Sequence, residues 1–86
     1  MKLKKEFITH DSGNEILLVP VGGALFSGLV KGNKTLGAIL ALLKEDTTQE
    51  EVIAAMLQRF DALEEVIKHD VKRALSELRK IGAIDE

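Results

Sequence analysis

Apolar and polar positions follow two different periods along the chain, and the period changes near residue 33. Before this point, short apolar runs alternate with turn residues, which is typical of β-strands. After it, apolar residues recur every three or four positions, as on the buried face of an α-helix. The sequence therefore predicts an α+β domain in which the strands precede the helices.

The first third of the chain predicts three antiparallel strands. Residues 6–10 combine β-branched and aromatic side chains, residues 11–14 form a turn cluster, and the apolar run 16–19 is closed by Pro20, so a hairpin is indicated. A third, weaker strand is predicted over residues 25–31, which contain a glycine of the kind that marks a bulge or a close backbone approach. If this strand lies at the sheet edge, its N–H and C=O groups are open to pairing.

Two of the three predicted helices have clear N-terminal signals. Asn33 is a candidate cap for the first helix, whose apolar positions cover more than one face and which residues 44–46 end. The run from Thr48 to Glu51 fits a capping box at the start of the second helix. In that motif the Thr48 hydroxyl accepts from the Glu51 N–H, and the Glu51 carboxylate reaches back to the cap.

The third predicted helix starts with residues 61–64, which repeat the capping pattern, and Gly82 is a fitting C-terminal cap. Its apolar positions recur over five turns: Leu63, Ile67, Val71, Ala74, Leu75, Leu78 and Ile81. Ile84 is expected to fold back onto the core. Three strands followed by three helices, with a tight turn between the last two, resemble a winged helix-turn-helix.

Length, composition and charge narrow the class of protein. Eighty-six residues, 45% of them apolar, suit a single domain, expected to span residues 1–86. Cysteine is absent, so there is no disulfide, thiol nucleophile or thiolate ligand. No apolar run approaches the roughly 20 residues that span a bilayer, and no hydrophobic signal segment follows the N-terminal lysines. A cytoplasmic protein without a membrane partner is the expectation.

Candidate catalytic and metal-binding residues are few. His10 lies beside the predicted turn and His69 on a charged helix, so both are expected at the surface. A zinc site needs three or four clustered ligands, which the sequence does not offer. The serines lack a nucleophile motif, and the glycine pairs lack the lysine and the spacing of a phosphate loop. We therefore expect no catalytic residue, metal site or cofactor, and no enzyme activity.

A helix-turn-helix suggests DNA binding, in which the second helix of the motif enters the major groove. The third predicted helix, however, is about neutral, and the chain carries 12 basic against 14 acidic residues for a net charge of -2. Nucleic-acid affinity depends largely on neutralising phosphates, so a nucleic-acid partner is disfavoured. A small winged-helix DNA-binding transcriptional regulator remains the alternative function.

The ordered combination of residues 32–43, 48–53, 70–71 and 75–84, together with 16–20 before them, resembles the PqqD family, named for pyrroloquinoline quinone (PQQ) synthesis. One departure is Gly32-Asn33, where many members carry Leu-Asn. The resemblance implies a chaperone-like module that recognises the leader of a ribosomally made, post-translationally modified peptide. It also implies a partner enzyme, often a radical S-adenosylmethionine maturase, in a pathway that need not be PQQ synthesis.

In the family, the leader adds as a strand to the third strand and lies in a groove against the third helix. The resemblance therefore implies two sets of peptide-binding residues. The strand set is Phe26, Ser27, Gly28, Leu29, Val30 and Lys31, and the helix set is Lys68, Lys72, Leu75 and Arg79. We expect the cations of the helix set to favour an acidic leader. The alternative, that Leu75 is core and the cations are solvated, stays open.

Two further expectations concern neighbouring residues and the open strand. Val71 and Leu78 are expected in the core, and Asp70 is expected to hold a neighbouring turn by a hydrogen bond. The third strand also offers an edge to a second copy of the chain, so a homodimer formed by edge pairing or by swapping is a third hypothesis.

Overall fold

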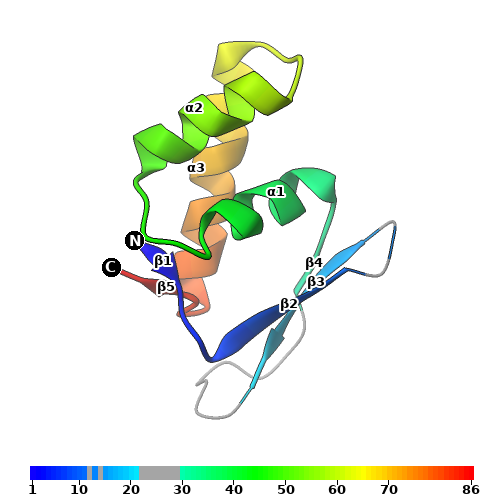
Figure 1. Ribbon diagram of the computed structural model, residues 1–86, viewed down its shortest axis with the longest axis vertical. Helices are drawn as coiled ribbons and strands as arrows, with labels where there is room; N and C mark the ends of the chain where they lie inside the picture. The colour runs from blue at the N-terminus through cyan, green and yellow to red at the C-terminus, as the bar shows by residue number, and fades with distance from the viewer. Residues whose placement is uncertain (12, 14, 22–29) are drawn as a thin grey trace.

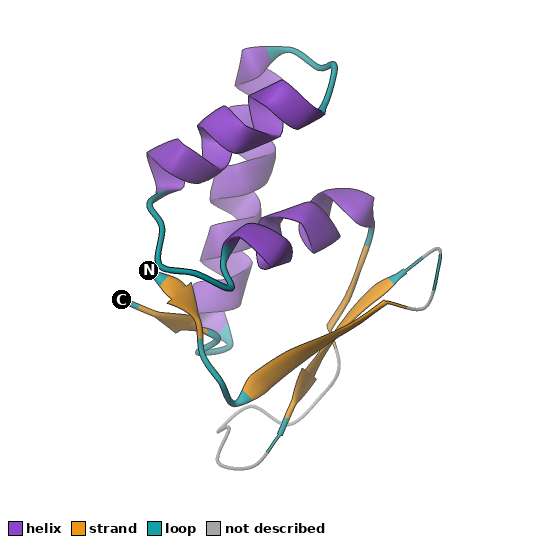
Figure 2. Ribbon diagram, in the orientation of Figure 1, coloured by secondary structure: helices purple, strands orange, loops and turns teal. Residues whose placement is uncertain are grey.

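The computed structural model describes residues 1–11, 13, 15–21 and 30–86. The elements follow in the order β1 (Lys2–Leu3), β2 (Phe7–Asp11), β3 (Ile16–Pro20), β4 (Val30–Gly32), α1 (Lys34–Leu42), α2 (Gln49–Arg59), α3 (Glu64–Lys80) and β5 (Ile84–Asp85). The predicted α+β class and the order of a hairpin, a third strand and three helices are confirmed (Figure 2). The two-residue strands at either end of the chain were not predicted.

The central sheet has three antiparallel strands in the order β2-β3-β4. β2 and β3 form the predicted hairpin, with Phe7 opposite Pro20 and Asp11 opposite Ile16. β4 corresponds to the C-terminal end of the third strand predicted over 25–31; residues 25–29 lie outside the described residues. β2 and β4 are thus the two edges of this sheet, and the helices lie to one side of it (Figure 1).

β1 and β5 join the two ends of the chain in a second, two-stranded sheet, in which Leu3 lies opposite Ile84. The N–H of Leu3 donates to the carbonyl of Leu43, and the N–H of Lys4 donates to the carbonyl of Ala83; each N···O distance is 2.8 Å. These bonds connect the N-terminal segment to the ends of α1 and α3. The side chain of Ile84 is buried, as predicted.

The predicted caps of α1 and α2 are present. The Asn33 carboxamide oxygen accepts from the Leu36 N–H at 3.1 Å, and the Thr48 hydroxyl accepts from the Glu51 N–H at 3.2 Å. The reciprocal half of the capping box differs from the prediction, because the Glu51 carboxylate accepts from the Thr47 hydroxyl instead (3.2 Å). Both helices therefore begin where a side-chain oxygen satisfies an otherwise unpaired N–H.

The predicted start of α3 was wrong and its predicted end is confirmed. Leu63 is the N-cap residue and makes no side-chain capping bond, so Asp61 does not cap the helix as the pattern predicted. At the C-terminus, Gly82 has φ +75° and donates to Arg79, while Ala83 donates to Leu78 (2.9 Å). This pair of bonds is a Schellman motif, for which glycine is favoured because it adopts positive φ without strain.

The core is apolar throughout the described part of the chain and draws on the helices, both sheets and the C-terminal turn. Its fully buried side chains include Leu18, Ile39, Leu40, Leu43, Val52, Met56, Val71, Leu75 and Leu78. α1 approaches β3 closely at Gly37, where an added Cβ would lie 2.6 Å from Cγ1 of Ile16. Glycine at this position therefore lets α1 pack directly on the central sheet.

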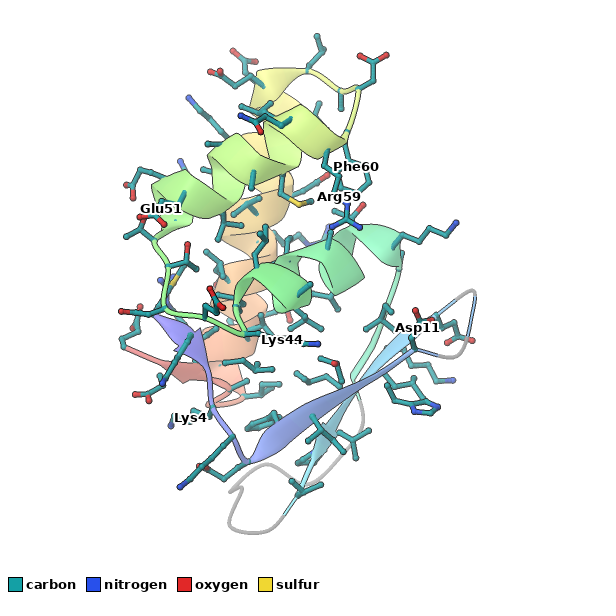
Figure 3. All side chains as sticks on the ribbon, in the orientation of Figure 1. Lys4, Asp11, Lys44, Glu51, Arg59 and Phe60 are labelled. Atoms are coloured by element: carbon teal, nitrogen blue, oxygen red, sulfur yellow. The ribbon has the colours of Figure 1, made fainter. Side chains whose placement is uncertain are left out.

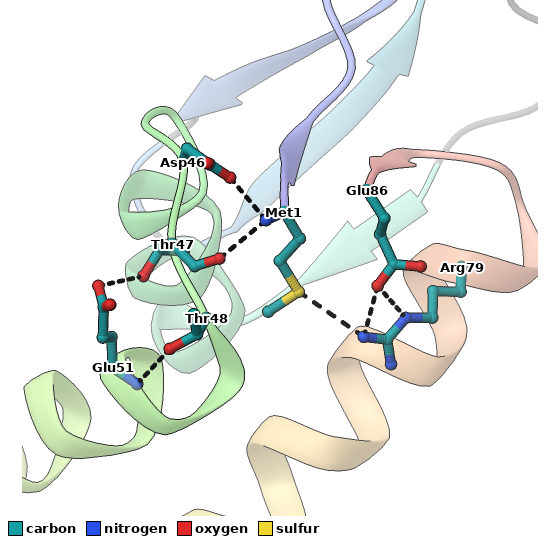
Figure 4. A network of polar contacts seen from close by, with 7 residues as sticks. All are labelled: Met1, Asp46, Thr47, Thr48, Glu51, Arg79 and Glu86. Carbon is teal, nitrogen blue, oxygen red and sulfur yellow. Dashed lines mark hydrogen bonds and ion pairs between the residues drawn. The ribbon is translucent and has the colours of Figure 1, made fainter.

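Polar contacts close the end of the molecule where the termini lie (Figure 4). The α-amino group of Met1 donates to Asp46 (2.6 Å) and to the Thr47 carbonyl (2.8 Å). The hydrogen bond from this amino group, with its positive charge, lowers the pKa of the exposed Asp46 carboxyl. Arg79 donates to Oε1 of Glu86 through Nε (3.2 Å) and Nη2 (2.9 Å).

Replacing Gly37 by alanine tests the α1–β3 contact. Alanine is the better helix former by about 1 kcal/mol, yet its Cβ collides with Ile16, so we expect Gly37→Ala to lower the free energy of unfolding by about 1–3 kcal/mol. Ile16→Ala should remove most of this loss in the double variant, which a double-mutant cycle in urea measures by circular dichroism. A more stable Gly37→Ala variant would contradict the contact.

Candidate functional site

The hydrogen-bonding direction of each strand residue follows from one backbone bond. The N–H of Val21 donates to the Glu6 carbonyl (2.6 Å), so position 6 faces β3. Along an antiparallel strand, the N–H and C=O of successive residues point alternately toward one neighbouring strand and away from it. Combined with the pairing of Leu18 with Val30 and of Ile16 with Gly32, this alternation directs the backbone groups of positions 30 and 32 toward β3. The N–H and C=O of Lys31 therefore point away from β3, toward the open edge of β4.

A hollow of about 600 Å³ adjoins β4, between the start of α1 and one face of α3. It is lined from the β4–α1 side by Lys31, Gly32, Asn33, Thr35, Leu36 and Ile39, and from α3 and its end by Asp70, Arg73, Ala74, Glu77, Leu78 and Ile81. The apolar side chains among these belong to the core or pack against it. The hollow therefore combines an apolar floor with a polar rim.

The charged groups on the rim are of both signs. Lys31 and Arg73 provide two cations, and Asp70 and Glu77 provide two carboxylates. Within the described part of the chain, the side chains of Asp70, Arg73 and Glu77 make no hydrogen bond or ion pair. The expectation that Asp70 holds a neighbouring turn was therefore wrong. The rim has hydrogen-bonding capacity available for a ligand.

Gly32 shapes the junction of β4 and α1. A Cβ at this position would lie 2.8 Å from Cβ of Leu36 and closer still to its Cδ2, so the Leu36 side chain occupies the space in front of Gly32. Both residues line the hollow. The departure from the Leu-Asn pattern of the resembled family thus has a steric explanation, since a larger side chain at position 32 would displace Leu36.

Two of the ten predicted peptide-binding residues belong to β4. Lys31 lies at the hollow with its backbone groups on the open edge, whereas the backbone of Val30 faces β3. The other four strand residues, Phe26, Ser27, Gly28 and Leu29, lie outside the described residues.

The four predicted helix residues do not line the hollow. Leu75 is 0% exposed and belongs to the core, as Val71 and Leu78 do, so its predicted place in the groove was wrong. Lys68 pairs with Glu64 (3.1 Å), and Arg79 pairs with Glu86. Lys72 is exposed.

A one-residue step along α3 explains this difference. Asp70, Ala74 and Glu77, which line the hollow, each immediately precede a buried residue of α3. Lys68, Lys72 and Arg79 each immediately follow one. Because one residue turns an α-helix by about 100°, these two sets lie on opposite flanks of the buried stripe. The apolar period identifies the stripe but not the flank that faces β4.

The described residues offer no cluster typical of a metal centre. No group of three or more His, Asp or Glu residues that could hold a metal ion occurs among them. His10 and His69 are exposed, as predicted. In the part of the chain that the structure describes, no helix combines the length and apolarity needed to cross a bilayer.

Comparison with known families and structures assigns this fold. The family described as "Coenzyme PQQ synthesis protein D (PqqD)" matches residues 11–84. The chain belongs to the PqqD family. A search of curated proteins finds no match. Among solved structures, "TbiB1 in Complex with the TbiA(beta) Leader Peptide" is similar over 99% of this chain and 100% of that chain, with a TM-score of 0.75 and 18% sequence identity. The PqqD resemblance inferred from the sequence is confirmed.

Separate substitutions test the assignment of Leu75 to the core and of Lys72 to the solvent. We expect Leu75→Ala to lower the free energy of unfolding by about 2–5 kcal/mol, because it leaves a cavity in the core. Lys72→Ala should change it by less than about 0.5 kcal/mol. Urea unfolding followed by circular dichroism measures both. Equal losses in the two variants would contradict the assignment.

Proposed function

We propose that this chain binds the leader segment of a ribosomally made precursor peptide as an additional strand along β4 and presents the peptide to a modifying enzyme. Membership of the PqqD family and the fold shared with a protein solved with a leader peptide support this function. The observation that carries it is the outward-facing backbone of Lys31 beside the hollow. An edge strand next to an apolar depression is what strand addition requires.

The hollow supplies the part of the binding energy that backbone pairing lacks. A backbone hydrogen bond contributes about 0.5–1.5 kcal/mol net, whereas micromolar affinity needs about 8 kcal/mol. The bonds that Lys31 offers are therefore too few. Burial of apolar leader side chains against Leu36, Ala74 and Ile81 supplies a large part of the remainder, since each fully buried aliphatic side chain contributes about 1.5–3 kcal/mol.

The rim indicates what kind of leader fits. Arg73 lies between Asp70 and Glu77 on the same face of α3, and Lys31 lies across the hollow. The acidic leader expected from the sequence depended on the cations of the opposite flank. With two charges of each sign at the hollow, the preferred leader carries an apolar anchor flanked by polar or mixed charges. Electrostatics then contributes to register more than to raw affinity.

The role proposed for the chain is presentation rather than catalysis. The covalent step belongs to a partner enzyme, a radical S-adenosylmethionine maturase or another enzyme that modifies ribosomally made peptides. The family assignment supports such a partner without specifying the pathway.

Hydrogen exchange tests strand addition at a single amide. In the free protein the Lys31 N–H faces the open edge, so we expect it to exchange rapidly, whereas the Gly32 N–H faces β3 and is expected to be protected. We expect leader peptides translated from short reading frames flanking the gene to slow exchange at Lys31 and to leave Gly32 little changed. Exchange read out by NMR on ¹⁵N-labelled protein gives both values. Saturable binding without protection of Lys31 would contradict addition to β4.

A bulky side chain in the hollow tests the anchor. Ala74 lines the hollow and is half-buried, while Ala54 is exposed on α2. We expect Ala74→Trp to weaken leader binding at least about tenfold, equivalent to about 1.4 kcal/mol, and Ala54→Trp to leave it unchanged. Calorimetric titration measures the affinities. Equal affinity of the two variants would exclude the hollow as the anchor site.

DNA binding, the alternative function, receives less support from the side chains of α3. Two of the five cations of α3, Lys68 and Arg79, are already paired with carboxylates. A phosphate backbone would have to compete with these partners. In the same titrations, duplex DNA serves as a control ligand. Tight binding of the duplex that falls steeply with salt would favour a regulator over a peptide-binding module.

A further inference from the structure

β2, the second edge strand of the central sheet, also carries backbone groups that can form hydrogen bonds. Because position 6 faces β3, the backbone groups of Phe7, Thr9 and Asp11 point away from β3. The Phe7 N–H is already bonded to the Lys4 carbonyl (3.1 Å). Both the N–H and the C=O of Thr9 lie on the open side, where no described strand pairs with β2. β2 therefore offers an edge for one more strand.

This edge strand lacks two residue types that commonly protect an exposed strand. Edge strands are commonly protected from unwanted pairing by lysine or proline. The five residues of β2, Phe7 to Asp11, include neither, and Ile8 within it is 51% exposed. The lysines nearby lie instead outside the strand, around a hollow at its beginning.

A hollow of about 760 Å³ lies where β1 turns into β2. Four lysines line it, Lys2, Lys4 and Lys5 from the N-terminal segment and Lys44 from beyond α1, against two carboxylates, on a chain of net charge -2. Figure 3 shows Lys4 and Lys44 on this side of the molecule. In the described part of the chain, Lys4, Lys5 and Lys44 form no ion pair. An excess of unpaired cations thus surrounds a concave surface.

We propose that the β2 edge and this lysine hollow dock an extended acidic segment of a partner protein. A guest strand beside β2 pairs with the backbone of Thr9 and contacts Ile8, while its carboxylates lie among the lysines. A segment with several carboxylates complements the hollow better than a second copy of this chain, since β2 contributes only one carboxylate, Asp11, whose Oδ1 already accepts from the Gly13 N–H (2.8 Å).

The proposal gives the domain two docking edges. A leader on β4 and a partner segment on β2 would lie about 19 Å apart, four strand spacings of roughly 4.8 Å. Both guests therefore fit at once, so the domain would bridge a peptide and its modifying enzyme. The β2 edge does not overlap the leader site, so its test is independent of the proposed leader binding.

Binding of a defined acidic strand tests the β2 edge. The probe is a capped, fluorescein-labelled eight-residue peptide of alternating valine and glutamate, and the comparator alternates valine and lysine. We expect the acidic peptide to bind with at least about tenfold higher affinity and to shift the amide signals of residues 4–9 and 44. Equal binding of the two peptides, no binding of either, or shifts confined to β4 and α3 would overturn the proposal.

Two variants separate charge from backbone pairing. Lys4→Glu/Lys5→Glu reverses the charge of the hollow, and Lys72→Glu/Lys80→Glu makes the same change at exposed positions of α3. Thr9→Pro removes the outward N–H without removing a bond to β3. We expect the first and third variants to lose at least about tenfold in affinity and the α3 variant to keep it. Circular dichroism verifies that each variant is folded. Should Thr9→Pro not fold, the amide shifts of the unchanged protein test pairing at the β2 edge.

Other occupants give distinct results. Binding of duplex DNA or phosphatidylserine vesicles that Lys4→Glu/Lys5→Glu abolishes, without binding of the acidic peptide, would overturn the proposal in favour of a polyanion site. A dimer in sedimentation that Thr9→Pro dissociates would overturn it in favour of self-pairing. If the unchanged protein does not bind the acidic peptide but the leader still protects the Lys31 amide, the β2 site is refuted and the proposed function stands.

Discussion

The backbone hydrogen-bonding groups at the margins of a three-stranded sheet are the constraint on which this structure depends. Each non-proline residue carries one donor and one acceptor, and edge strands leave half of theirs without a strand partner. Three strands are too few to close into a barrel, so both edges persist. The helices lie to one side of the sheet (Figure 1). No described strand pairs with the outer edge of β2 or of β4. Both margins therefore offer the backbone groups that an added strand would pair with, as proposed above.

The walls of the β4 hollow are held in place by contacts elsewhere in the core. Gly37 sets the approach of α1 to the sheet, and the buried stripe of α3 fixes the orientation of that helix. The Schellman turn at Gly82 directs the chain into β5, whose pairing with β1 anchors the end of α3. A leader bound as proposed would thus meet a preformed site, and preorganisation reduces the entropy lost on binding. The family departure at Gly32 is accommodated within the same wall by Leu36.

Elements with a long period or a specific capping residue were predictable from the sequence. Asn33, Thr48 and Gly82 mark helix ends because each satisfies a local backbone requirement. β1 and β5 were missed because two residues show no period and pair only across the full length of the chain. The reciprocal capping bond and the cap of α3 were wrong because short-range patterns do not determine which neighbour a side chain contacts. The groove flank of α3 depends on tertiary packing, which the apolar stripe alone does not specify.

The hollow beside β4 and the hollow at the start of β2 differ in the interactions that would select a ligand. Around the β4 hollow the charges balance, so the proposed leader binding would depend on backbone pairing and on the fit of an apolar anchor, and would tolerate variation in the flanking peptide sequence. Around the β2 hollow lysines exceed carboxylates, so long-range attraction would dominate there and weaken with salt. A module that binds variable peptides and one enzyme, as proposed, would use backbone recognition for the variable ligand and charge complementarity for the constant one.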